Sequence, residues 1–393
     1  MKFSVNRESF LRAFAAAESL CPNKADRPVL QAVRATVDQA GCTLQSSDLE
    51  CFLTSSVACT SIDKQGSCLL PAMTTSSIFR ESRCEQIVIE SSKDGHVRIV
   101  GESCDFSLQT EPVNDFPVVK QFECRDGKYS TLPAPWLREA IKRTIFASDP
   151  NNTKYTLGGV CIEFTPKGKC YLVATDGNRI ACMAAPATAF NEHFTPERSS
   201  LIPQKAARRI VQILDEEEGS VDVSVMDSLN IRCGTMEFNA TLLQGVFPPW
   251  RRAFVGDIER ETSVSIPAGV LTSLMRQAMI VTSKETRGLV FEFTPSMLKV
   301  SSSATERGKS GVQVPIVLQG NPVTLEMRGN YVLDFASLLK PEVIVTMELK
   351  DAETSVMFST EDDQHYAVST IITSDTDDAA KEAPKPAKEK AVA

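Results

Sequence analysis

Apolar and polar residues along the chain follow two alternating periods, one typical of helices and one typical of strands. After Pro203, apolar residues recur at helical spacing, at Ala207, Ile210, Val211 and Leu214. After Pro267 the same spacing returns, at Leu271, Leu274, Met275 and Ala278. Proline at or just before the first turn favours a helix start, and we therefore predict a helix in each segment. The stretches between helices are β-branched and alternate in polarity, which is typical of half-buried antiparallel strands.

The same unit returns along the chain. The octet Gly159–Pro166 reappears as Gly288–Pro295, 129 residues later, and a weaker copy begins near Val33. A second marker, Phe-Pro, stands at Phe116 and again at Phe247, 131 residues later. Two independent markers give nearly the same period, which predicts a repeat architecture of three units.

Each unit is expected to run helix, strands, helix, strands, which predicts an α+β domain with helices on one face of antiparallel sheet. The predicted helices span residues 7–20, 71–83, 136–147, 203–214, 267–281 and 331–340. We expect domains at 1–124, 125–256 and 257–374. Residues 375–393 are Ala, Lys, Glu, Pro and Asp with almost nothing apolar, so we expect a disordered C-terminal tail.

Composition narrows the class of protein. A chain of 393 residues suggests two or three domains. Its 12 cysteines contain no C-x-x-C pair and its three histidines lie far apart, so we expect reduced, mostly buried thiols and neither a metal nor another cofactor. No apolar run is long enough to span a bilayer, and the first residues lack a signal core. We therefore expect a cytoplasmic protein that does not bind membranes.

Positive charge gathers on the predicted helices although the net charge of the chain is −8. The six predicted helices together carry +7, so the remainder carries −15. The cations expected opposite the apolar stripes are Arg138, Lys142, Arg143, Lys205, Arg208, Arg209 and Arg276. If all helices faced a common centre, its lining would attract phosphates without reading bases. A single helix can carry several cations on one face by chance. An excess of cations over anions on helices of all three repeats is less easily explained by chance.

Several short motifs resemble the bacterial DNA polymerase III beta subunit, the sliding clamp family, across residues 1–374. They are Met1–Phe3 before an amphipathic helix, Ser47–Glu50, Asn114–Pro117, Val173–Arg179 and Phe247–Arg252. Each motif is weak alone, and their order and spacing make the resemblance specific. The resemblance implies a head-to-tail homodimer that forms a ring, with antiparallel sheets outside and helices lining a central hole. Such a ring encircles duplex DNA and acts as a processivity factor.

The resemblance also implies three sets of site residues. A cleft would bind peptides of the DNA polymerase III alpha subunit, the clamp loader and repair proteins; its residues would be Leu157, Thr175, Gly177, Asn178, Arg179, Ile180, Pro248, Arg252, Ala253, Val368 and Ile371. The resemblance adds to the DNA-facing residues Arg27, Asn151, Asn152, Lys154 and Lys205, while Met73 replaces a basic residue of the family. The dimer interface would hold Phe106, Ile280, Val281, Arg307 and Lys309. There the acidic Glu102 and Asp105 would face the basic segment, with signs reversed from the family.

Catalysis finds little support in the sequence. The chain has no G-x-x-x-x-G-K-[ST] loop, no H-E-x-x-H and no G-x-S-x-G elbow, so we expect a protein that is not an enzyme. A metal-dependent DNA phosphoesterase using Asp48, Glu50 or Asp176 is the first alternative. However, the Thr-Asp-Gly run at Asp176 is better interpreted as a turn. A second alternative is an adaptor that binds partners without forming a ring.

Overall fold

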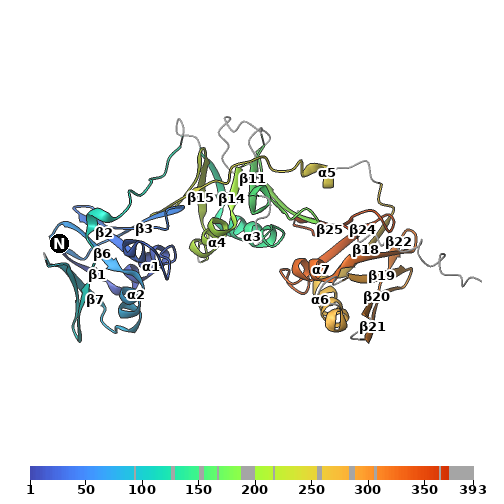
Figure 1. Cartoon of the computed structure of the whole chain (residues 1–393), viewed down its shortest axis with the longest axis horizontal. Helices are drawn as coiled ribbons and strands as arrows, with labels where there is room; N and C mark the ends of the chain where they lie inside the picture. Colours follow the sequence, from blue (N-terminus) through green and yellow to red (C-terminus); the bar gives the residue numbers. More distant parts are fainter. Residues whose placement is uncertain are drawn as a thin grey trace, which may run out of the picture. The chain divides into compact units, whose positions relative to one another are not determined.

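The structure, a computed structural model, describes residues 1–92, 94–124, 129–149, 155–165, 168–186, 200–215, 217–254, 259–282, 288–304, 308–362 and 364–370. It divides into two compact units, Met1–Arg252 and Ala253–Ala393 (Figure 1). The first unit contains two of the predicted repeats and the second unit contains the third. None of the described helices has the length and apolarity needed to cross a membrane.

Six helices of eight residues or more in the described ranges each begin directly where a strand ends. The pairs are β1 (Lys2–Asn6) with α1 (Arg7–Glu18), β6 (Gly66–Pro71) with α2 (Ala72–Glu81), β10 (Ser130–Pro133) with α3 (Ala134–Ile145), β14 (Ser200–Pro203) with α4 (Gln204–Ile213), β18 (Thr262–Pro267) with α6 (Ala268–Ala278), and β23 (Val323–Arg328) with α7 (Gly329–Ala336). Proline is the N-cap of four of them, because its fixed φ and missing N–H suit the last extended residue before a helix. The predicted helices are confirmed, with bounds that differ by up to four residues.

The strands of the first unit form antiparallel sheets. Its other strands are β2 (Ala32–Asp38), β3 (Gly41–Ser47), β4 (Cys51–Val57), β5 (Ser61–Lys64), β7 (Gln86–Ser91), β8 (His96–Gly101), β9 (Cys104–Gln109), β11 (Gly159–Phe164), β12 (Lys169–Thr175), β13 (Arg179–Pro186), β15 (Ser220–Val225), β16 (Ser228–Cys233) and β17 (Met236–Thr241). One sheet has the order β5-β1-β7-β8-β9, and an eight-stranded sheet has the order β10-β15-β16-β17-β4-β3-β2-β6. Strands β14-β11-β12-β13 are neighbours in that order. The pairing of β17 with β4, with Phe238 opposite Leu53, joins the first two repeats into one sheet.

The second unit repeats the same plan. Its other strands are β19 (Gly288–Thr294), β20 (Met297–Ala304), β21 (Gly308–Pro315), β22 (Leu318–Gln319), β24 (Ile344–Leu349), β25 (Val356–Ser359) and β26 (Gln364–Val368). They form the order β21-β20-β19-β23 in one sheet and β26-β25-β24-β18-β22 as neighbours in another. Helices α6 and α7 lie against each other, as α1 and α2 do and as α3 and α4 do. The predicted α+β clamp fold, with helices packed on antiparallel sheets, is confirmed.

Aromatic side chains pack on the buried faces of the helices. In the first repeat, the rings of Phe10 and Phe79 stack with centroids 4.5 Å apart, and all atoms of both side chains are buried. In the third repeat, Phe335 stacks on Tyr366 at 4.8 Å. Burial of rings of this size supplies much of the stability of each domain. The polar side chains on the opposite faces of these helices are directed to solvent.

The first two repeats share one turn in atomic detail. After β3, Asp48 Oδ1 accepts hydrogen bonds from the backbone N–H groups of Glu50 and Cys51 at 3.1 and 2.7 Å. After β12, Asp176 Oδ1 accepts them from the corresponding residues at 2.9 and 3.0 Å. The residue directly after each aspartate has a positive φ, which is 94° at Gly177 and 74° at Leu49. This conformation is easy for glycine and strained for leucine, so the first repeat forms the turn with a residue type that suits it less well.

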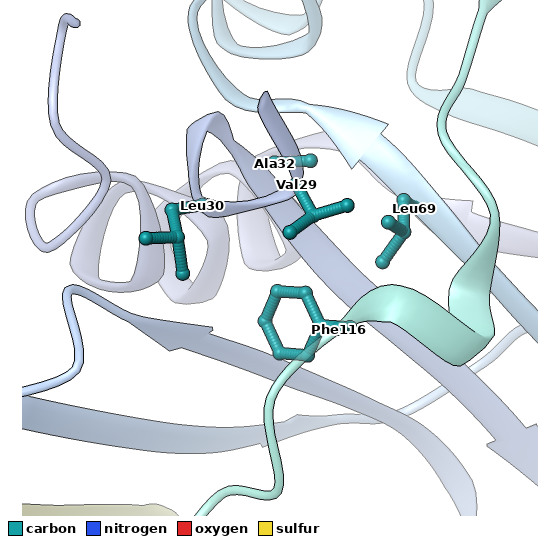
Figure 2. Packing of buried hydrophobic residues seen from close by; sticks show 5 residues of the cluster. All are labelled: Val29, Leu30, Ala32, Leu69 and Phe116. Atoms are coloured by element: carbon teal, nitrogen blue, oxygen red, sulfur yellow. The ribbon is translucent and has the colours of Figure 1, made fainter. Parts of the chain in front are cut away.

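The Phe-Pro marker of the first repeat fixes the segment that leaves this domain. Figure 2 shows the Phe116 ring directed toward Val29, Leu30 and Leu69, and all five residues of this cluster, including Ala32, are buried. Val29 and Leu30 belong to the short 3-10 helix η1 (Pro28–Gln31), whose N-cap is Arg27. The cluster therefore holds the loop with Arg27 against the domain while the Arg27 side chain is exposed.

Candidate nucleic-acid and partner-binding sites

Lys205, on the first turn of α4, is engaged by two carboxylates of the first repeat. Its ammonium nitrogen lies 2.8 Å from Asp48 Oδ2 and 3.5 Å from a Glu50 oxygen. Partial burial lowers the pKa of Lys205, but the hydrogen bond and charge of Asp48 and the charge of Glu50 together raise it above its ordinary value. Asp48 and Glu50, which the phosphoesterase alternative requires as metal ligands, are thus used in a turn and an ion pair.

Arg138 and Lys142, on α3, lie near the end of α4. The Arg138 guanidinium donates to the carbonyl of Leu214 at 2.8 Å and to that of Asp215, and it lies 3.6 Å from Glu218. The Lys142 ammonium lies 3.8 Å from an Asp215 oxygen. Cations are stabilised at the C-terminus of a helix, where carbonyl groups lack partners. Part of the positive charge of α3 therefore serves to join α3 to α4.

The expectation that Arg143 lies opposite the apolar stripe of α3 is wrong. Arg143 is buried, and its Nε donates to Glu139 at 2.8 Å, one turn earlier. The buried face of α3 is wider than the sequence pattern indicates, because it includes Ala140 and Thr144 as well as the predicted apolar residues Leu137 and Ile141. Arg143 sits at the margin of this face, where an i, i+4 pair compensates its charge.

Other predicted DNA-facing cations are open to solvent. Arg208 on α4 and Arg276 on α6 are exposed, and no ion pair of either is present within the described ranges. Arg209 is half-buried and donates to the Gln212 side chain at 3.0 Å. The predicted residues Asn151, Asn152 and Lys154 lie outside the described residues. The exposed arginines belong to helices of different repeats, as a distributed contact with a phosphate backbone requires.

The turn after β12 positions Arg179, a predicted cleft residue. Arg179 Nε donates to Asp176 Oδ2 at 2.9 Å, and its Nη2 donates to the Phe146 carbonyl at 2.7 Å. Its guanidinium also stacks over the Phe146 ring, 5.4 Å from the centroid. With only 9% of its side chain exposed, Arg179 is a rigid part of the site. The interpretation of the Thr-Asp-Gly run as a turn is confirmed, since the Thr175 hydroxyl and Asp176 close it.

Glu163, the fifth residue of the repeated octet, holds the segment that contains Pro248 and Arg252. Its Oε2 accepts the Trp250 indole N–H at 3.1 Å, and its Oε1 accepts a bond from Arg251 at 2.6 Å. Arg251 in turn stacks over the Trp250 ring at 4.3 Å. Glu163 is not among the site residues predicted from the sequence, although its recurrence as Glu292 in the second octet was a signal. Through Trp250 and Arg251, Glu163 positions the segment that holds the predicted cleft residues Pro248 and Arg252.

The predicted cleft residues of the first unit divide into buried and exposed groups. Leu157, Thr175 and Ile180 are buried. The exposed group consists of Gly177, Asn178, Pro248 and Arg252. Sites for short apolar peptides combine buried apolar side chains with a few polar groups. In the second unit Ala253 is half-buried and Val368 is buried, and Ile371 lies outside the described residues.

The predicted dimer residues lie on strands at the edges of sheets. Phe106 is on β9, the last strand of its sheet, and 41% of the residue is exposed. Lys309, exposed, is on β21, the last strand of a sheet in the second unit. Ile280, 75% exposed, and Val281, half-buried, are in the short 3-10 helix η5 (Met279–Val281). Arg307 lies outside the described residues. Large apolar groups exposed beside open strand edges indicate surfaces for another chain.

Comparison with known proteins identifies the class. Models of the DNA polymerase III beta subunit match residues 1–120, with the N-terminal domain, and 131–249, with the central domain. The beta sliding clamp of Pseudomonas putida is 24% identical over 382 residues, covering 94% of this chain and 99% of that protein. That of Escherichia coli is 26% identical over 359 residues, covering 91% and 95%. The crystal structure of the DNA polymerase III subunit beta from Pseudomonas aeruginosa matches with a TM-score of 0.86 at 23% identity, covering 94% of this chain and 100% of that one.

The repeated strand–helix units and these matches define a protein of the clamp fold. The chain belongs to the family of bacterial DNA polymerase III beta subunits. The phosphoesterase and adaptor alternatives receive no support from these relatives. Among the side chains that the structure describes, no three His, Cys, Asp or Glu residues lie together where they could hold a metal ion.

Proposed function

We propose that the protein is a DNA sliding clamp. Two chains close head to tail into a ring around duplex DNA, and the ring tethers the DNA polymerase III alpha subunit, the clamp loader and other replication and repair proteins. The protein is not an enzyme, and it works in the cytoplasm. Each chain supplies three domains, 1–124, 125–256 and 257–374, followed by a tail at 375–393. The observation that supports this most strongly is a strand–helix unit repeated along the chain with cations on its helices.

The ring contacts DNA through its helices without reading the base sequence. Arg208 and Arg276 supply exposed guanidinium groups from different repeats, and Arg27 supplies a third from the loop before η1. Arginine contacts to phosphate oxygens are independent of base identity and weaken with added salt. Lys205 and Arg138 add positive potential. Because Lys205 is paired with a carboxylate and Arg138 with a carbonyl group, each attracts phosphate less strongly than a cation without such a partner.

The two chains join by pairing β9 of one with β21 of the other. Such pairing removes both open edges and leaves no free end for further growth, since two equal joints close a ring. Phe106 on one side and Ile280 with Val281 on the other supply apolar area. The charges of exposed Glu102, just before β9, and exposed Lys309, on β21, are complementary, while Asp105 of β9 is paired with Arg98 of its own chain.

Partner proteins bind through short apolar peptides at the site that includes Leu157, Ile180 and Pro248. Buried Leu157 and Ile180 form its base, and Arg179 is held in place by Asp176 and Phe146. A pre-organised base costs little ordering entropy when a peptide binds. This makes a small surface sufficient for moderate affinity.

An image of single particles tests the proposed ring. We expect native mass measurements to give twice the mass of one chain and averaged particle images to show a central hole. A particle of that mass without a hole would contradict the proposal, and so would a monomer at every practical concentration.

A further inference from the structure

Two cysteines of the first domain lie side by side near the edge strand β9. Cys84 precedes β7, and Cys104 is the first residue of β9, paired with Gly101 of β8. A Cβ atom placed on Gly101 would lie 2.6 Å from the Cys84 sulfur and 3.0 Å from the Cys104 sulfur. The two sulfur atoms therefore occupy the space that the missing side chain of Gly101 leaves free.

Hydroxyl and amide groups surround this pair. The Ser103 hydroxyl lies 3.7 Å from the Cys84 sulfur, and the Ser82 hydroxyl lies 3.9 Å from the Cys104 sulfur. The backbone amide of Ser103, with the two serine hydroxyls and the Cys104 thiol, lowers the pKa of the Cys84 thiol to about 7. Hydrogen bonds of this kind favour a thiolate over a thiol. A lowered pKa increases the thiolate fraction of Cys84 near neutral pH, beside the second thiol of Cys104.

Other cysteines of the chain have the opposite environment. Burial raises the pKa of Cys51 and of Cys68 to about 12, and burial also raises the pKa of the half-buried Cys59. Thiols with raised pKa values react slowly with oxidants. Cys84 is 5% exposed and Cys104 is half-buried, so a molecule as small as a peroxide reaches the pair from the Cys104 side.

We propose that Cys84 and Cys104 form a reversible thiol–disulfide pair that is oxidised by hydrogen peroxide. The Cys84 thiolate attacks one peroxide oxygen, the O–O bond breaks, and hydroxide leaves, which gives a sulfenic acid. The Cys104 sulfur then attacks the Cys84 sulfur, its thiol proton leaves with the displaced hydroxyl as water, and a disulfide forms. Two electrons pass from the sulfurs to the peroxide. A dithiol returns both residues to thiols by exchange.

The position of the pair connects it with the proposed dimer, and this part rests on the proposed function. Cys104 and Phe106 lie on the same face of β9, since they pair with Gly101 and Ile99 of β8. A disulfide requires sulfurs about 2.05 Å apart, so oxidation draws the start of β9 toward Cys84. We expect this movement to disturb pairing at the outer edge and to raise the dimer dissociation constant.

Peptide mapping after peroxide treatment tests the pair. Trypsin places Cys84 in peptide 84–93 and Cys104 in peptide 99–120, with one cysteine in each. We expect oxidised, alkylated protein to yield these peptides joined, with a mass two hydrogens below their sum, and dithiothreitol to separate them. The Cys59→Ser variant should behave like the wild type. In Cys104→Ser, Cys84 should stop at a sulfenic acid that dimedone traps, and in Gly101→Ala the joined peptide should form more slowly.

Two results would overturn these inferences separately. The thiol pair would be overturned if Cys84 and Cys104 stayed reduced at a peroxide dose that oxidises Cys59. It would also be overturned if either residue formed its disulfide with a different cysteine. Sedimentation of oxidised and reduced protein tests the link to the dimer, with oxidised Cys104→Ser as the control. A joined pair with an unchanged dimer dissociation constant would overturn that link while the thiol pair stands. An absence of dimer in the reduced wild type would instead contradict the proposed function.

Discussion

The ammonium group of Lys205 lies 2.8 Å from the Asp48 carboxylate, which connects helix α4 of the second repeat to the turn after β3 of the first. Only 4% of the Asp48 side chain is exposed, whereas 52% of the Lys205 side chain is exposed. The carboxylate is already committed to the backbone of its own turn. The pair therefore neutralises a nearly buried charge and fixes the two repeats relative to each other.

The Lys205→Ala substitution should destabilise the first unit. It leaves the Asp48 carboxylate without its counter-ion, and because Lys205 is half exposed, solvent screening limits the cost to about 1 kcal/mol. Arg208→Ala on the same helix is the matched control, expected to cost less than about 0.5 kcal/mol because this exposed side chain forms no ion pair in the described ranges. Urea unfolding measures both. An equal or larger loss in Arg208→Ala would contradict this role of the pair.

Glu163 and Glu292 occupy the same place in two repeats and should differ strongly in their effect on stability. Glu163→Ala removes the acceptor of the Trp250 indole and of Arg251, and an unsatisfied buried polar group costs about 1–3 kcal/mol. Glu292 pairs with Lys299 on the surface at 2.9 Å, so Glu292→Ala should cost less than about 1 kcal/mol.

Unfolding by urea and binding of an apolar partner peptide are the measurements for these two variants. Peptide affinity should fall in Glu163→Ala, because Pro248 and Arg252 lose their support, and stay unchanged in Glu292→Ala. Equal effects of the two substitutions would show that Glu163 has no positioning role.

Phe106→Asp should weaken self-association. The substitution removes apolar area from β9 and adds a negative charge next to Asp105, and we expect the dimer dissociation constant to rise at least about tenfold, equivalent to roughly 1.4 kcal/mol. Val118→Asp is the control, since Val118 is more exposed than Phe106, at 88% against 41%, but lies outside the edge strand. Sedimentation equilibrium reports the constants. Equal weakening by both substitutions would argue against the β9 interface.

Alkylation of Cys84 should depend on pH near neutrality. The thiolate is the reactive form, and its fraction rises as pH increases through the pKa of about 7. The rate for peptide 84–93 with iodoacetamide should therefore reach half its maximum near pH 7. That of Cys59, whose pKa is raised by burial, should still be rising above pH 9. A Cys84 profile that coincides with that of Cys59 would contradict the proposed environment.

Much of the fold could be predicted because it depends on local pattern. The prolines at Pro71, Pro133, Pro203 and Pro267 mark strand ends that become helix starts, and the structure has them as N-caps. The two octets revealed the period of the repeat. They form equivalent strands of two repeats, and equivalent strands have similar apolar patterns because each packs on the core of its own domain. A turn such as Thr175–Arg179 is also local, because Asp176 bonds to backbone groups two and three residues later.

The partners of charged side chains could not be predicted in the same way. Helical spacing shows which face Lys205 occupies, but its partner Asp48 lies in another repeat, 157 positions earlier. Arg138 reaches the end of α4 for the same reason, through the packing of two helices. Cys84 and Cys104 meet only because the β8–β9 hairpin folds back beside the segment after α2. Each of these contacts depends on tertiary structure that no short window of sequence contains.

Retention on circular DNA tests the central claim most directly. The protein is loaded on a nicked circle, washed at high salt, and its dissociation rate is compared before and after a single cut that linearises the DNA. A closed ring stays on the circle and slides off the new ends, so we predict long retention before the cut and rapid loss after it. Dissociation that depends on salt but is the same on circular and linear DNA would contradict encirclement and indicate ordinary electrostatic binding.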